Sequence, residues 1–254
     1  MPFMAGLGHP RAALAVAVTS WMPAQSPGMS ENGNIRQGDR MTEHQLPTLA
    51  QQQERVEALR RELGEAHPDT LAAMLDLAEM LWARGRLAEG RILEEHVVAA
   101  RRQALGEEHA DTLKALGKLA TTIGALGDLD EARRLQEHIV ELAPTAWGET
   151  GRDTLRAANN LAGTIAAQGD LAGARRVLEA TIDTMHEALG AEDHDTLTAI
   201  GNLAAMLWQY GERGEAYWLQ CQVVETRRRA QGDNDPATRA ALAVLEAMHR
   251  DGMP

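Results

Sequence analysis

One short stretch of sequence, Leu63-Gly64-Glu65-Ala66-His67-Pro68-Asp69-Thr70-Leu71, returns four more times in varied form. The interval is always 42 residues, and each set of positions at this interval is called a repeat column below. Three columns keep one residue type throughout: Thr70, Thr112, Thr154, Thr196 and Thr238; Gly64, Gly106, Gly148, Gly190 and Gly232; Leu77, Leu119, Leu161, Leu203 and Leu245. Such a fixed interval is the signature of an array whose units bury apolar surface only against their neighbours.

The composition narrows the fold class and the partners. Aromatic residues make up only 3% of the chain and β-branched residues are few, which favours closely packed helices, and we expect an all-α fold. The formal net charge of -12 disfavours nucleic acid as a partner, because phosphate binding needs a clustered basic surface. No apolar run approaches the roughly 18 residues that cross a bilayer, so no membrane span is expected.

Residues 1–47 are predicted to form a flexible tail. They carry scattered proline, glycine and serine and match no repeat column, so they bury too little apolar surface to offset the entropy of ordering. The apolar run Ala12–Val18 is interpreted as part of a disordered or mis-assigned leader, and the alternative is a weak secretory signal. The first interpretation predicts a cytoplasmic protein and the second a secreted or periplasmic one.

Each unit carries the start and stop signals of two antiparallel helices. A capping column precedes the first helix, proline or an acid occupies its first turn, and a glycine column stops it. Small residues in the columns of Ala73 and Gly90 permit close helix packing. The capping column is His67, His109, Gly151, Asp193 and Asp235, and the glycine column is Gly85, Gly127, Gly169 and Gly211.

The array is predicted to span residues 48–250. It opens with a half-repeat at 48–64, continues with repeats that start near 67, 109, 151 and 193, and closes with a capping helix at 236–250, followed by a short tail at 251–254.

Two places in the array carry more specific expectations. Val56, Leu59 and Leu63 are expected to share one apolar stripe of the opening helix. The irregular stretch 143–151 predicts that the second helix of the second repeat ends early, near Leu142. Trp147 stands in the column of Leu63 and is interpreted as a core contact, with a ligand contact as the alternative.

The chain resembles the tetratricopeptide repeats. The resemblance lies in the two-helix unit, the Leu-Ala pair in its first helix, the glycine between its helices and the Glu-Ala that opens its second helix. The interval of 42 residues and the Leu-Gly-x-x-His-Pro-Asp-Thr-Leu opening are similar to the kinesin-light-chain type. The resemblance covers roughly residues 48–250. It implies a right-handed superhelical solenoid of antiparallel helix pairs, whose concave groove is lined by the first helix of each pair and holds a peptide or protein segment.

The resemblance also implies site residues. In that family an asparagine before the Leu-Ala pair contacts the backbone of a bound peptide, and Asn160 and Asn202 match it, whereas Asp76 and Lys118 depart from it. Neighbouring positions make the candidate groove acidic at its start, basic in its middle and neutral at its end. The alternative is a solvated face with no ligand, on which the tryptophans pack against the next repeat. The candidate groove residues are Asp76, Glu79, Trp82, Lys118, Arg156, Asn159, Asn160, Asn202 and Trp208.

Catalytic and metal chemistry is not expected. His67 and His109 are interpreted as helix caps, and a cation bridged by His96 and His138 is the weaker alternative because no His-Glu-x-x-His pair is present. Cys221, the single cysteine, has no adjacent base and is interpreted as an unactivated thiol. We therefore expect no cofactor and no enzymatic activity.

Two functions remain open on the sequence. The first is a scaffold or adaptor that binds an extended peptide or protein segment in its groove. The alternative is a structural protein that self-assembles into homo-oligomers through the array ends or the convex face.

Overall fold

The computed structural model describes residues 47–251, so most of the predicted tail and residues 252–254 lie outside the described range. Between residues 47 and 251 the chain folds into ten helices, α2 to α11, and contains no strand. These helices form two compact units: an N-terminal unit at 47–127 and a C-terminal unit at 128–251. The all-α prediction is confirmed.

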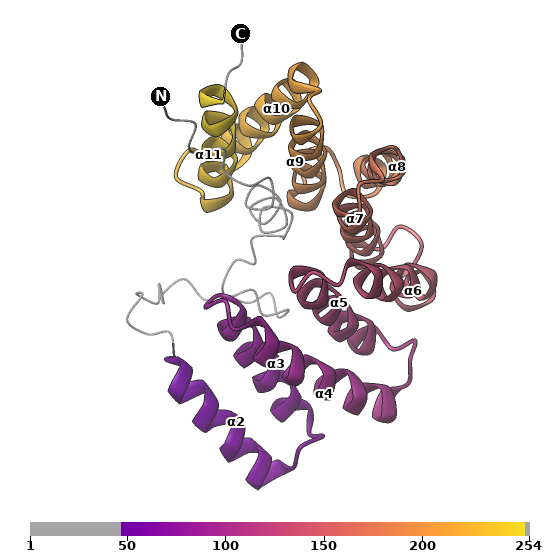
Figure 1. Cartoon of the computed structure of the whole chain (residues 1–254), viewed down its shortest axis with the longest axis vertical. Helices are drawn as coiled ribbons and strands as arrows, with labels where there is room; N and C mark the ends of the chain where they lie inside the picture. The colour runs from indigo at the N-terminus through magenta and orange to yellow at the C-terminus, as the bar shows by residue number, and fades with distance from the viewer. Residues whose placement is uncertain (1–46, 252–254) are drawn as a thin grey trace, which may run out of the picture. The chain divides into compact units, whose positions relative to one another are not determined.

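The N-terminal unit contains four helices. Each packs against the next along the chain, so α3 and α4 form the first complete repeat, with α2 before it and α5 after it (Figure 1). The buried stripe of α3, which includes Leu71, Met74 and Leu81, is the predicted one. The helices are α2 (Leu49–Leu63), α3 (Pro68–Trp82), α4 (Leu87–Leu105) and α5 (Ala110–Ala125).

The C-terminal unit contains six helices, again packed in chain order. Leu178, Met185 and Ala174 lie at the centre of one apolar cluster, and Val223, Val224 and Ala241 join α10 to α11 in another. The helices are α6 (Leu129–Trp147), α7 (Arg152–Ala167), α8 (Leu171–Ala188), α9 (His194–Gln209), α10 (Arg213–Gln231) and α11 (Pro236–Arg250).

At the three repeat boundaries that carry Gly64, Gly106 and Gly148, the threonine and glycine columns together build the turn between repeats. Gly64 has a φ of 94°, a left-handed conformation that favours glycine, and its carbonyl accepts a hydrogen bond of 2.8 Å from the Thr70 hydroxyl. Thr112 repeats this bond to Gly106 at 2.8 Å. His67 then caps α3, because its Nδ1 accepts from the Asp69 amide at 3.2 Å. The repeated motif is therefore a helix-start device.

One predicted helix end is wrong. The helix α6 does not stop near Leu142 but continues through Pro144 to Trp147, and the Gly148 amide donates to the Pro144 carbonyl at 2.9 Å. Ala143 is fully buried, and its carbonyl accepts from the Thr154 hydroxyl of α7. Packing of the last turn on the next repeat therefore outweighs the backbone hydrogen bond that proline removes.

The apolar stripe predicted for the opening helix is buried along only part of its length. Val56 is buried and Leu59 is half-buried, but Leu63 is 45% exposed at the end of α2. Leu105 in the same column is similarly exposed, and Trp147 is half-buried. This column therefore lies at the rim of the helix packing rather than inside it.

Candidate functional site

In the C-terminal unit, the two candidate helices α7 and α9 are joined by a pair of buried amides. Asn159 on α7 is 7% exposed and Asn202 on α9 is 6% exposed. The Asn202 Nδ2 donates to the Asn159 Oδ1 at 3.1 Å. Each amide therefore uses part of its bonding capacity to hold the neighbouring repeat in place.

Asn160 differs from Asn202 although both stand in the same column. Its side chain is partly exposed on α7, and within residues 47–251 it has no hydrogen-bond partner. An amide presents two N–H donors and a carbonyl acceptor. Asn160 is thus the candidate amide whose donors and acceptor are all available to a ligand.

Arg156, near the start of α7, belongs to an ion-pair cluster that joins the starts of α7 and α9. Its Nε donates to Asp195 at 2.9 Å, and Arg152 bonds both Asp195 and Asp193, the latter at 2.8 Å. Burial raises the pKa of Asp193, but the bonds from Arg152 and from the Asp195 amide outweigh burial and hold this pKa below its usual value. The cluster orders the start of α9 beside the start of α7, and Arg156 is one of its members.

Trp208, at the far end of α9, is half-buried against the larger apolar cluster of this unit. The Arg213 guanidinium lies 5.2 Å from the centroid of its ring, within the range of a cation–π contact. Trp208 therefore combines core packing with partial exposure.

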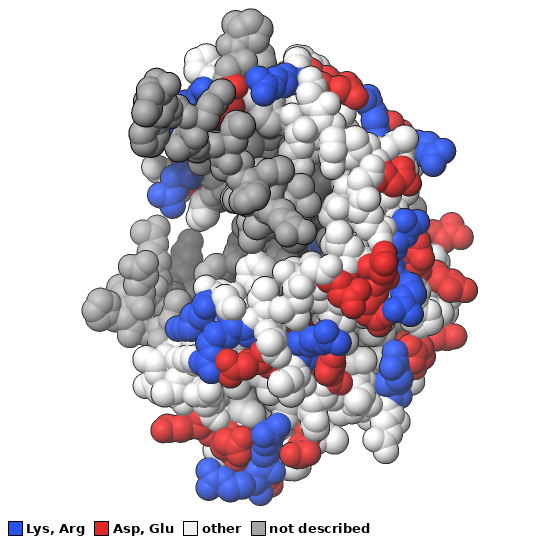
Figure 2. All heavy atoms as spheres, in the orientation of Figure 1, with Lys and Arg blue, Asp and Glu red and all other residues white. Residues whose placement is uncertain are grey.

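The candidate residues of the N-terminal unit pair mainly with one another. Glu79 on α3 forms an ion pair with Lys118 on α5. The Asp76 Oδ2 lies 4.0 Å from the Nη1 of Arg55 on α2. Burial, and then the nearby Glu79 charge, raise the pKa of Asp76. Trp82 is half-buried, and its indole nitrogen has no partner among residues 47–251. Elsewhere, basic and acidic side chains also lie next to one another on the face shown in Figure 2.

The sequence analysis did not identify one set of buried polar residues. Gln52 and Gln220 are buried, and each donates its side-chain amide to a carbonyl of the following helix, Gln52 to Ala73 at 3.0 Å and Gln220 to Ala241 at 2.8 Å. Both belong to one repeat column, together with Glu94. A polar residue recurring on the packed side of the second helix was the signal that could have revealed them.

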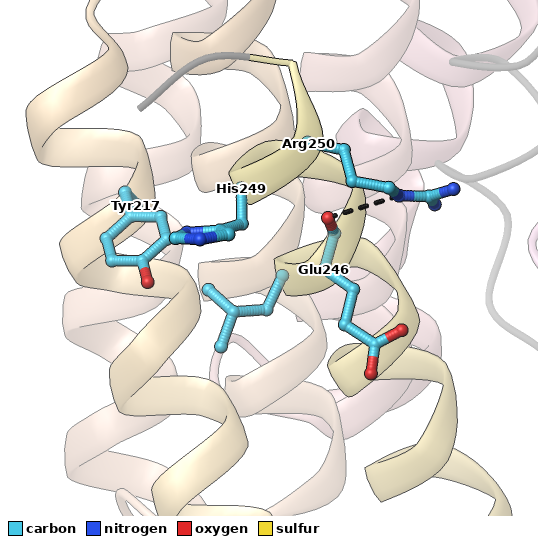
Figure 3. Close-up of a pocket in the computed structure, with 5 residues that line it drawn as sticks. Tyr217, Glu246, His249 and Arg250 are labelled. Atoms are coloured by element: carbon cyan, nitrogen blue, oxygen red, sulfur yellow. Dashed lines mark hydrogen bonds between the residues drawn. The ribbon is translucent and has the colours of Figure 1, made fainter. Parts of the chain in front are cut away.

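An open depression between α10 and α11 is lined by Tyr217, Leu245, Glu246, His249 and Arg250. Figure 3 shows the His249 ring beside Tyr217, whereas the Glu246 carboxylate and the Arg250 guanidinium point apart. The Arg250 Nε donates at 3.4 Å to the Glu246 backbone carbonyl. Because the polar groups diverge, the depression does not have the convergent polar lining of a small-molecule site.

Histidine and cysteine give no further site in the described range. His67 and His109 are helix caps, as interpreted from the sequence. Within residues 47–251, no group of three or more His, Cys, Asp and Glu side chains is placed to hold a metal ion. Burial raises the pKa of the Cys221 thiol, which disfavours the reactive thiolate.

The helices of residues 47–251 also lack a candidate for crossing a membrane, since none is both long and apolar enough.

Comparison with known proteins agrees with this architecture. One tetratricopeptide-repeat family model matches residues 69–145, and a second matches residues 154–195. The chain is a tetratricopeptide-repeat protein. No curated protein matches it significantly. Tetratricopeptide repeats generally mediate protein–protein interaction or scaffolding.

Solved structures identify the type of repeat. Two crystal structures of nearly identical TPR-like repeats assigned to a kinesin light chain of Podosopora anserina are 29% identical to this tetratricopeptide-repeat chain. They cover 72% of it and 86% and 87% of their own chains, with TM-scores of 0.59 and 0.57. The structure of BtubC (BKLC) from P. vanneervenii is 18% identical, covers 80% of this chain and 82% of its own, and has a TM-score of 0.63, which shows a shared fold.

Proposed function

We propose that this tetratricopeptide-repeat protein is a non-enzymatic scaffold or adaptor that binds an extended peptide segment on the α7–α9 face of its C-terminal unit. The observation that carries the proposal is the Asn160 amide, which is partly exposed and has no partner among residues 47–251. An amide that both donates and accepts can pair with the N–H and C=O groups of an extended peptide without reading its sequence.

The surroundings of Asn160 support an extended ligand. Gly163 and Ala205, on α7 and α9, are partly exposed and small, so a backbone can approach closely. Trp208 contributes a partly exposed aromatic side chain on α9, a residue type that is enriched at protein interfaces. Asn202 acts differently from Asn160: its bond to Asn159 holds the two helices together beneath the face.

The test begins with a selection of random twelve-residue peptides against the immobilised full chain. The selected peptide is then titrated into wild type, Asn160→Ala and a control, Gln222→Ala, on the exposed outer side of α10. Loss of one or two neutral hydrogen bonds at about 0.5–1.5 kcal/mol each predicts that Asn160→Ala weakens binding roughly tenfold. If all three proteins bound the peptide with equal affinity, the α7–α9 face would not be the binding site.

A mass measurement over a range of concentrations separates this function from self-assembly. Capture of a peptide by a monomer supports the proposal. A mass that grows with concentration and a peptide that does not bind would favour the structural alternative.

A further inference from the structure

A buried carboxylic acid occupies a glutamine position of the repeat. Position 94, on α4 of the N-terminal unit, is Glu94, and the rest of its column is Gln52, Gln136, Leu178 and Gln220. Its side chain is only 5% exposed, and its Oε2 has no hydrogen-bond partner within residues 47–251. A glutamine amide can donate in this place, whereas an ionised carboxylate can only accept.

The repeat register identifies the group that Glu94 faces. Gln52 and Gln220 donate to the carbonyls of Ala73 and Ala241, which share a column, and the equivalent residue on α5 is Ala115. Ala115 is fully buried. A protonated Glu94 carboxyl carries one O–H donor and can therefore replace the glutamine amide, while the ionised form directs a negative charge toward a carbonyl oxygen.

Four other side chains act on Glu94 from the helices around it. Thr122 of α5 hydrogen-bonds it and Lys118 of α5 attracts its charge, whereas Glu79 of α3 and Glu95 of α4 repel it. Lys118 is already engaged in the ion pair with Glu79. No cation in the N-terminal unit is therefore dedicated to Glu94.

We propose that Glu94 makes the α4–α5 contact of the N-terminal unit sensitive to pH: the neutral carboxyl donates to the Ala115 carbonyl, and the ionised carboxylate weakens the contact and competes with Glu79 for Lys118. Burial raises the pKa of Glu94 to about 7, so the change occurs near neutrality. Release of Lys118 leaves Glu79 unpaired beside Asp76, which makes the α3 face more negative. The inference concerns a different unit from the proposed peptide face and stands independently of it.

Hydrogen–deuterium exchange of the full chain tests the proposal. Exchange of the α4 and α5 amides is followed from pH 6 to pH 8, corrected for the intrinsic rate, in wild type, Glu94→Gln and the exposed control Glu108→Gln. The raised pKa predicts that the opening equilibrium of α4 and α5 increases roughly tenfold over this range in wild type and Glu108→Gln. Glu94→Gln is expected to abolish the increase, and the α8 and α9 amides are expected to show none in any of the proteins.

A second measurement does not depend on the variant. Carbon-detected NMR titration of the carboxyl groups in the wild-type chain is expected to show one glutamate that titrates near pH 7. Identical pH profiles for wild type and Glu94→Gln would overturn the proposal. A spectrum in which every glutamate titrates between about pH 4 and pH 5 would also overturn it.

Discussion

The two units share one backbone plan but differ in the chemistry that joins their first helices. In the N-terminal unit, α3 and α5 are linked by the exposed ion pair of Glu79 and Lys118. In the C-terminal unit, α7 and α9 are linked by the buried amides of Asn159 and Asn202. Apolar columns specify helix packing in both units, so the remaining positions are free to carry different chemistry. The two faces are therefore expected to respond differently to salt, pH and mutation.

The buried column of the second helices shows the same contrast. The C-terminal unit has Gln136, Leu178 and Gln220 there, which are uncharged at every physiological pH, whereas the N-terminal unit has Gln52 and the ionisable Glu94. In this column, therefore, only the N-terminal unit carries an ionisable group. Four substitutions test this comparison.

The largest effect is expected from Leu178→Ala, which should destabilise only the C-terminal unit. Leu178 is completely buried in the larger apolar cluster, and a leucine-to-alanine cavity costs about 2–5 kcal/mol. Urea denaturation gives the loss of unfolding free energy, and hydrogen exchange assigns it to a unit. Ile92→Ala is the control, because Ile92 is 66% exposed and its loss should cost less than about 0.5 kcal/mol. Equal loss of protection in α3 and α4 would contradict the division into two units.

A second substitution, Gln136→Glu, should transfer proton sensitivity to the C-terminal unit. A buried glutamate has a pKa in the folded state above that of the unfolded chain, so the native state binds more protons between the two values. The stability of the Gln136→Glu variant is therefore greatest at low pH and falls as pH rises toward the folded-state pKa of the new glutamate. If the pKa resembles that of Glu94, about 7, the loss from pH 5 to pH 8 is roughly 2–3 kcal/mol.

Urea denaturation at these two pH values measures the effect of Gln136→Glu, and the wild-type C-terminal unit is the reference. If the stability of the Gln136→Glu variant did not depend on pH, water would have to hydrate the carboxylate at position 136.

An intermediate effect is expected from Asn202→Ala. The substitution leaves the buried Asn159 carbonyl without its donor, at a cost of about 1–3 kcal/mol. Asn160→Ala is the matched comparison at the same column, and its unfolding free energy should change by less than about 0.5 kcal/mol. Thermal and urea melts of both variants separate a structural amide from a free one. The distinction would fail if the two substitutions were equally costly.

The smallest effect is expected from Glu79→Gln, which breaks the ion pair with Lys118. Both side chains are partly exposed, and such pairs contribute about 0–1 kcal/mol. The loss should shrink further in 1 M salt, where exposed charges are screened. Urea melts at low and high salt measure it, and a loss above about 2 kcal/mol would show that this pair is structurally equivalent to the buried amides.

Local signals account for most of what the sequence predicts correctly. The capping column is found at the start of helix α3 and its four counterparts, and the all-α architecture follows from the scarcity of aromatic and β-branched residues. The continuation of α6 past Leu142 was not predictable locally, because it depends on the packing of Ala143, next to Pro144, on α7. Nor did local pattern reveal that Leu63 lies outside the buried stripe.

The sequence alone determines where the helices begin and which apolar columns meet, because those signals lie within one repeat and recur at a constant interval. Only the tertiary structure decides that Asn202 is bonded while Asn160 is free, and that Glu94 is buried beside Lys118 and Glu79. The physical reason is that the burial and partners of a polar side chain depend on the facing residue of a neighbouring helix. The column of a residue predicts its position on the helix, whereas the surroundings contributed by the next repeat decide its chemistry.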